Sequence, residues 1–295
     1  MVAARSRSPR EPPGNRHPTL DGPEHRELFA RLEGASGLDF QAYRPAMVAR
    51  RIEHRMRISR ASSLREYAAL LGRDPLELAR LLDALLIKTT AMFRGEQAFA
   101  ALRDRVLPGL LARRAAEGAI CVRAWVAGCS TGEEAYSLAM CLLEARDRAV
   151  PGLAIEVLAS DVDARALERA ASGAVSASQA ARVPEALSKR WLREEGEGYY
   201  ITEELRTHLV FVRHDVLDPA CRAPRRAVFA SFDLVSCRNL IIHFQRQPQL
   251  EVVGRLAQAC EEGSVLFLGS AETLPASLLR EFVPLAASAS LYARR

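Results

Sequence analysis

Apolar residues in the first third of the chain recur every three to four positions, and this spacing predicts helices with one buried face. The clearest example is the segment 47–60, where Val48, Ile52 and Met56 form an apolar stripe among charged residues. Similar spacing continues on both sides of this segment. The pattern therefore predicts an all-α domain over residues 25–90.

After residue 90, helical segments alternate with short runs of strand-forming residues. A helix is expected at 99–116, interrupted at Pro108 because proline cannot donate a helical hydrogen bond. The alternation predicts an α/β fold over residues 91–295, a doubly wound seven-stranded sheet that is mostly parallel and whose last pair is antiparallel. The strands named from the sequence are 122–127, 155–161, 208–215, 232–239, 264–272 and 290–295.

The segment from 172 to 207 breaks this alternation. Its sequence predicts a helix and then a small hairpin, with EGYYI and HLVFV on either side of a turn. Trp191 is expected in the local core of this hairpin rather than in a binding site. We therefore expect a small β subdomain, at about residues 178–208, inserted into the α/β domain.

The turn after the first strand carries the strongest chemical signal. Residues 128–132 read GCSTG and lead into a helix that opens on Glu133 and Glu134. A glycine turn between a strand and a helix is typical of a nucleotide pocket in an open α/β sheet. The two acids would repel a pyrophosphate and attract a cation, and the spacing fails both G-x-G-x-x-G and the P-loop pattern. The turn favours S-adenosylmethionine, although a plain strand-to-helix connection remains open.

A second acid follows the next strand. Asp161 ends the apolar run 155–161, at the carboxyl edge of the predicted sheet. A carboxylate at this position can accept hydrogen bonds from both hydroxyls of a ribose. The alternative is that Asp161 caps the following helix, and one side chain cannot serve both roles well.

Composition limits the class of protein. Of 295 residues, 49% are hydrophobic, and the six cysteines form no C-x-x-C pair or cluster with histidine. Neither a zinc site nor a disulfide framework is indicated, so we expect no metal and a reducing, cytoplasmic location. No apolar run approaches the length of a membrane span, and we expect no membrane insertion.

The net charge of +5 lies entirely in residues 1–60, which hold 12 arginines against seven acidic residues. Residues 1–24 are rich in Pro, Ser, Gly and Arg, and this composition predicts a disordered basic tail without the aromatic residues that stack on nucleic-acid bases. The arginines of 47–60 either form an ordinary solvated face or dock an acidic protein partner. The docking candidates are Arg50, Arg51, Arg55 and Arg57.

Taken together, the motifs resemble the chemotaxis receptor methyltransferase family, CheR, from residue 25 to 295. The resemblance implies an all-α domain joined to a class I S-adenosylmethionine-dependent methyltransferase domain. It further implies methyl transfer to glutamate side chains in the cytoplasmic domain of methyl-accepting receptors, by a protein expected to be a monomer. The motifs are the basic helix 47–60, TTAMFR, GCSTGEEAYSLAM, LASDVD, RHDVLD, FDLVSCRNLIIHF and LFLGSAE.

The resemblance also implies roles for single residues. Arg94 would contact the reactive end of the cofactor and grip the acceptor carboxylate, and Asp161 would bind the ribose. The full set of cofactor-binding positions implied is Lys88, Thr90, Arg94, Glu134, Asp161, Asp215, Val216, Cys237 and Arg238.

Two positions depart from the family pattern. Lys88 stands where the family usually has Asn, and a lysine beside a sulfonium is unfavourable unless its ammonium points to solvent or to the cofactor carboxylate. His243 stands where the family has Tyr near the transferred methyl group, and we expect it to act in catalysis as a neutral imidazole. The hairpin loop REEGEGYYI is also short, so we expect no docking on a C-terminal receptor pentapeptide.

Two alternative functions remain open at this point. Lys88 and His243 could have ended catalysis, which would leave a regulatory module that binds S-adenosylmethionine or S-adenosylhomocysteine. A nucleic-acid methyltransferase is the weaker alternative, because the segment CRNLIIHF lacks the Asn or Asp followed by Pro-Pro-aromatic that such an enzyme would need. We therefore expect no nucleic-acid partner.

Overall fold

The computed structural model describes residues 20, 22–196, 198–220, 223–224, 231–286 and 289–295. The chain divides into two compact units after Leu85, earlier than the boundary at residue 90 that the sequence suggested. The predicted tail over residues 1–24 lies almost wholly outside the described residues, and the first helix begins at Pro23.

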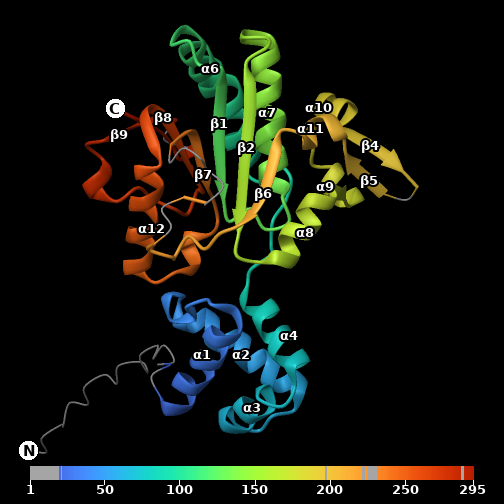
Figure 1. Ribbon diagram of the computed structural model, residues 1–295, viewed down its shortest axis with the longest axis vertical. Coiled ribbons are helices and arrows are strands. Elements are labelled where there is room, and N and C mark those ends of the chain that lie inside the picture. Colours follow the sequence, from blue (N-terminus) through green and yellow to red (C-terminus); the bar gives the residue numbers. More distant parts are fainter. Residues whose placement is uncertain (1–19, 21, 197, 221–222, 225–230, 287–288) are drawn as a thin grey trace, which may run out of the picture. The chain divides into compact units, whose positions relative to one another are not determined.

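The first unit is helical (Figure 1). In α2 the predicted stripe is buried at Val48 and Ile52, while Met56 is only half-buried and Ala49 joins the core. Ser63 caps α3 by accepting a hydrogen bond from the N–H of Glu66. The helices are α1 (Pro23–Ser36), η1 (Phe40–Ala42), α2 (Pro45–Ser59), α3 (Leu64–Leu71) and α4 (Pro75–Leu85).

The second unit contains a seven-stranded sheet in the order β6-β2-β1-β7-β8-β10-β9 (Figure 1). This confirms the doubly wound α/β prediction and the antiparallel final pair, and β10 is also antiparallel to β8. The strand β9 was not named from the sequence. The strands are β1 (Cys121–Ala127), β2 (Ala154–Asp161), β6 (Leu209–Arg213), β7 (Phe232–Cys237), β8 (Cys260–Leu268), β9 (Phe282–Ala286) and β10 (Leu291–Arg294).

The helices of this unit differ from the prediction at Pro108. The helical path is continuous there, and Pro108 lies in the first turn of α6. The irregularity lies just before it, in a π-helical turn, η2, where the N–H of Leu107 reaches the carbonyl of Leu102. The helices are α5 (Glu96–Ala101), η2 (Leu102–Val106), α6 (Leu107–Ala116), α7 (Glu133–Ala149), α8 (Ala164–Ser172), η3 (Ile241–His243), α12 (Arg246–Gln258) and η4 (Ala276–Leu278).

A small three-stranded sheet, in the order β3-β5-β4, is inserted between α8 and β6. The predicted hairpin partner was wrong: the segment GYYI pairs with LREE, whereas LVFVR joins the main sheet beside β2. Trp191 is fully buried, as expected of a core residue. The elements are β3 (Ala174–Val175), α9 (Ala177–Ala180), α10 (Glu185–Trp191), β4 (Leu192–Glu195), β5 (Gly198–Ile201) and α11 (Glu203–Arg206).

Candidate active site

The glycine turn between β1 and α7 has an unusual backbone. Gly128, Ser130 and Gly132 all have positive φ, at 74°, 50° and 95°. A Cβ on Gly128 would lie 2.6 Å from Cδ2 of Leu240, so only glycine fits there. The hydroxyl of Ser130 is buried and has no hydrogen-bond partner among the residues that the structure describes. A polar ligand at this turn would satisfy it.

Asp161 lies beside this turn at the end of β2. Its carboxylate accepts hydrogen bonds from the N–H of Ser130 at 2.8 Å and the N–H of Asp163 at 2.9 Å. Burial raises the pKa of Asp161 and these hydrogen bonds lower it, and the net pKa lies above the ordinary value. The cap of α8 is Asp163, which accepts from Arg165 and Ala166, so the interpretation of Asp161 as a helix cap was wrong. The ribose role remains a prediction.

Lys88 has a partner of its own. Its ammonium lies 2.8 Å from Oδ2 of Asp163, in an ion pair that is partly buried. Burial raises the pKa of Asp163, but Lys88 and the N–H of Ala166 lower it, and the net pKa lies below the ordinary value. The positive charge that the sequence placed near a sulfonium is therefore neutralised within the protein.

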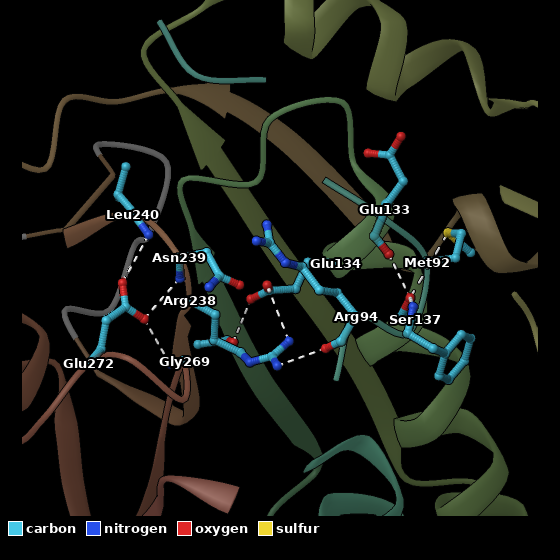
Figure 2. Close-up of polar contacts among 12 residues, drawn as sticks. Met92, Arg94, Glu133, Glu134, Ser137, Arg238, Asn239, Leu240, Gly269 and Glu272 are labelled. Atoms are coloured by element: carbon cyan, nitrogen blue, oxygen red, sulfur yellow. Dashed lines mark hydrogen bonds and ion pairs between the residues drawn. The ribbon is translucent and has the colours of Figure 1, made fainter. Parts of the chain in front are cut away.

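Glu134 lies in the first turn of α7, among polar side chains and with 13% of its own side chain exposed (Figure 2). The hydroxyl of Ser236 donates to its Oε1 at 2.7 Å, and Nη1 of Arg238 lies 3.6 Å from its Oε2. Burial raises the pKa of Glu134, while Arg238, Ser236 and Arg94 act in the opposite direction. Ser236 was missed by the sequence analysis, although it lies within the motif FDLVSCRN.

Arg238 makes several contacts with the protein. Nη2 donates to the backbone carbonyl of Arg94 at 2.7 Å, and the guanidinium carbon lies 4.4 Å from the ring centre of Phe267 and 5.1 Å from that of Phe99. The side chain is 4% exposed. Arg238 therefore supports Glu134 and the Arg94 backbone rather than presenting its guanidinium to solvent.

The segment that carries Thr90 and Arg94 is fixed by contacts that the sequence did not reveal. Gln179 of α9 accepts from the N–H of Met92 at 3.0 Å and donates to the carbonyl of Thr90 at 3.2 Å. The guanidinium of Arg94 donates to the carbonyl of Thr89 at 2.9 Å. In Figure 2, Arg94 lies in the same cluster as Glu134 and Arg238.

The remaining predicted cofactor positions line the ends of β6 and β7. Asp215 accepts from the N–H of Leu217 at 2.8 Å, and burial raises the pKa of its carboxyl. Val216 is buried, and the thiol of Cys237 is fully buried with its pKa raised for that reason. Any contact of Cys237 with a ligand would therefore have to come from its backbone.

His243 ends η3, in the loop after β7, and is half-buried. The preceding backbone is held by Glu272, whose carboxylate accepts from the N–H groups of Asn239, Leu240 and Ile241. Glu272 was quoted in the motif LFLGSAE but received no role from the sequence. The available signal in the sequence was an acid shortly after the apolar run of a predicted strand.

The candidate docking arginines in α2 fall into two pairs. Arg55 makes two hydrogen bonds to the buried Glu77, and Arg51 donates to the carbonyl of Ala84 at 2.8 Å. Arg50 and Arg57 are exposed. Two of the four predicted docking side chains are thus held in contacts within the first unit.

Two family models cover most of the chain. Residues 88–288 match the SAM binding domain of CheR methyltransferase, and residues 23–86 match its all-alpha domain. The chain belongs to the CheR methyltransferase family. Its cofactor is S-adenosylmethionine, as the glycine turn and its acids indicated.

Named relatives differ in length. The chain is 37% identical over 260 residues to an uncharacterized 104.1 kDa protein of Rhodobacter capsulatus, covering 86% of this chain and 26% of that protein. It is 34% identical to a probable biofilm formation methyltransferase of Pseudomonas aeruginosa, covering 86% of this chain and 58% of the relative. It is 29% identical to a chemotaxis protein methyltransferase of Listeria monocytogenes, covering 81% and 85%. The chain thus spans about a quarter of the first relative.

The residues at the sheet edge fit this cofactor. The hydroxyl of Ser130, without a partner in the described part of the chain, offers a polar contact. Glu134, Asp161 and Asp215, in or after the elements of this edge, supply acids for a cationic ligand with a ribose. Among the described residues, no group of three or more His, Cys, Asp or Glu side chains could hold a metal ion. Within the same residues, no helix is both long and apolar enough to cross a membrane.

Proposed function

We propose that the protein transfers a methyl group from S-adenosylmethionine to glutamate carboxylates in the cytoplasmic domain of methyl-accepting receptors, forming methyl esters. The observation that carries the proposal is the cluster at the sheet edge. There, Arg94 lies beside the buried Glu134, and its backbone carbonyl is held by Arg238. A guanidinium at this place is suited to an anionic acceptor.

The chemistry requires positioning more than proton transfer. S-adenosylmethionine, when bound, supplies an electrophilic methyl group on a positively charged sulfur. A glutamate has an ordinary pKa of about 4.3, so the acceptor is already ionised at neutral pH and needs no general base. Arg94 would hold one carboxylate oxygen and leave the other free to react. Such positioning contributes roughly 7 to 11 kcal/mol of barrier lowering in favourable cases.

The direct test incubates the protein with labelled methyl donor and receptor cytoplasmic fragments, and measures base-labile methyl ester. Arg94→Ala should lose most of the turnover while it keeps its affinity for S-adenosylhomocysteine, because the lost contact is to the acceptor. Arg94→Lys should recover little, since it keeps the charge without the planar fork. Turnover within about threefold of wild type would remove Arg94 from the proposal.

His243 is proposed to act as a neutral imidazole near the methyl group. A protonated ring would repel the sulfonium, so the rate should fall as pH decreases from 8 to about 5.5. A rate that stays constant over this range, with the fold intact by circular dichroism, would contradict this role.

The exposed arginines of α2, Arg50 and Arg57, are proposed to attract acidic helices of the receptor. The double variant Arg50→Glu, Arg57→Glu should raise the apparent KM for receptor fragments and leave S-adenosylhomocysteine affinity unchanged. Added salt should weaken receptor binding, because exposed charges are screened over about 8 Å at physiological ionic strength. The control variant Arg105→Glu, Arg148→Glu makes the same change of charge at exposed positions of the second unit. An equal effect of the control would rule out a specific docking face.

In the β4–β5 hairpin, Glu195 pairs with Gly198, so the hairpin is short. We therefore propose recognition without a C-terminal receptor pentapeptide. Fragments with and without that peptide should be methylated at the same rate. The alternative of a regulatory module without catalysis depended partly on the charge of Lys88. It is less favoured because that charge is paired with Asp163.

A further inference from the structure

Glu272 is a buried acid in the loop after β8, with 3% of its surface exposed. Its carboxylate accepts four backbone hydrogen bonds (Figure 2). Oε1 accepts from Leu240 at 2.9 Å and Ile241 at 3.0 Å, while Oε2 accepts from Asn239 at 2.8 Å and Gly269 at 2.7 Å. No described lysine or arginine forms an ion pair with it. Neutral amides alone therefore satisfy this carboxylate.

The four bonds join the loops that follow two neighbouring parallel strands, since Cys237 of β7 pairs with Leu268 of β8. Asn239 has φ 58°, in the left-handed region that costs free energy for most residues. A Cβ at Gly269 would overlap Oε2 of Glu272, so the glycine leaves room for the carboxylate. The local backbone is thus shaped around this one side chain.

The segment that Glu272 holds reaches two parts of the site. The side chain of Leu240 packs on Gly128 of the cofactor turn, and the backbone continues through Ile241 into His243. We propose that Glu272 is a positioning residue: it holds the segment 239–243 in its turn before the acceptor arrives, and so fixes the acceptor side of the site. This role rests on the proposed function.

Glutamine cannot replace Glu272 in this role. An ionised carboxylate offers about four acceptor positions, and all of them are used here. The amide of Gln would turn an NH₂ group toward two backbone N–H donors, whichever way it is placed. Two donors would lose their acceptor and meet another donor. The substitution Glu272→Gln, which is conservative in size, is therefore disruptive at this position.

The experiment compares wild type, Glu272→Gln and a matched control, Asp233→Asn. Asp233 is also buried and accepts from the N–H of Arg123 at 2.8 Å, but it forms an ion pair with Arg114 at 2.7 Å and lies at the opposite end of β7. Three quantities are measured: kcat on receptor fragments, the Kd of S-adenosylhomocysteine by calorimetry, and hydrogen exchange of residues 238–244 without ligand.

For Glu272→Gln we expect kcat to fall between about tenfold and a hundredfold, because small misplacements of reacting groups cost this much. The Kd of S-adenosylhomocysteine should stay within about threefold, and exchange of residues 238–244 should accelerate. Asp233→Asn should change neither kcat nor this exchange. If Glu272→Gln does not fold, Glu272→Asp, which keeps the charge but withdraws the oxygens, should show a smaller loss of kcat with the same exchange pattern.

Unchanged exchange, or a kcat within about threefold of wild type, would overturn the positioning role. A loss of S-adenosylhomocysteine affinity equal to the loss of kcat would also overturn it, since Glu272 would then serve the cofactor. A wild-type protein that methylates no receptor fragment would contradict the proposed function, while the exchange result would still decide whether Glu272 holds the segment.

Discussion

The two halves of the sheet edge are held together in different ways. At the ends of β1 and β2, Asp161 accepts backbone N–H groups, and its contact with Ser130 spans 31 residues of sequence. At the end of β7, the contact of Ser236 with Glu134 spans 102 residues, and that of Arg238 with the Arg94 carbonyl spans 144. The Asp161 carboxylate thus accepts from peptide amides, whereas the Glu134 carboxylate meets the side chains of Ser236 and Arg238.

Because the two acids have different partners, their removal should affect ligand affinity and stability to different extents. Loss of Asp161 leaves the neutral amides of Ser130 and Asp163 without this acceptor, at a moderate cost. Removing an acid beside a buried guanidinium costs more, because the guanidinium keeps its charge and loses its partner. We therefore expect the loss of Asp161 to act more on cofactor binding, and the loss of Glu134 to act more on folding.

The largest effect on stability is expected from Glu134→Ala. The guanidinium of Arg238 would lose its acid in a buried pocket, and the free energy of unfolding should fall by about 3 to 5 kcal/mol. Urea denaturation at pH 7 measures this. The control is Glu133→Ala in the same helical turn, where the carboxylate accepts from the hydroxyl of Thr131. A loss as small as that of the control would show that the β7 half does not depend on this pair.

Asp161→Ala should act mainly on the cofactor. If Asp161 binds the ribose as proposed, its loss should weaken binding of S-adenosylhomocysteine about 10- to 100-fold, with a smaller loss of stability than Glu134→Ala. Titration calorimetry gives the affinity. Asp163→Ala serves as the control, since it removes only a helix cap and the Lys88 ion pair. The comparison fails if the two variants bind the ligand equally well.

Lys88→Met should have the smallest effect. The pKa of Asp163 is depressed in the folded protein, so the ion pair stabilises the fold fully at pH values above the unfolded pKa of about 3.9. This stabilisation is lost as pH falls through the lower pKa of the folded state. The variant should be less stable by about 0.5 to 1 kcal/mol at pH 7. Denaturation curves of the variant and wild type should converge once the pH falls below the folded pKa of Asp163. A difference that persists there would mean that Lys88 acts by packing.

Short-range patterns determined much of the fold. The helical spacing around Val48 and Ile52, the strand-helix alternation, and the glycine turn before Glu134 all depend on residues close in sequence, and the structure agrees with them. The hairpin was assigned to the wrong partner because LREE is short and charged and lacks the alternation of a half-buried strand. The sequence pattern could not separate that edge strand from a loop.

The supporting contacts of the site were decided by tertiary structure alone. Nothing near Glu272 in the sequence indicates that its carboxylate meets three amides of the loop after β7, and nothing near Arg55 indicates its partner Glu77. Periodicity and motifs report which face of an element is apolar and which residues share a turn. They do not report which side chains from distant segments meet, because that depends on how the elements pack in three dimensions.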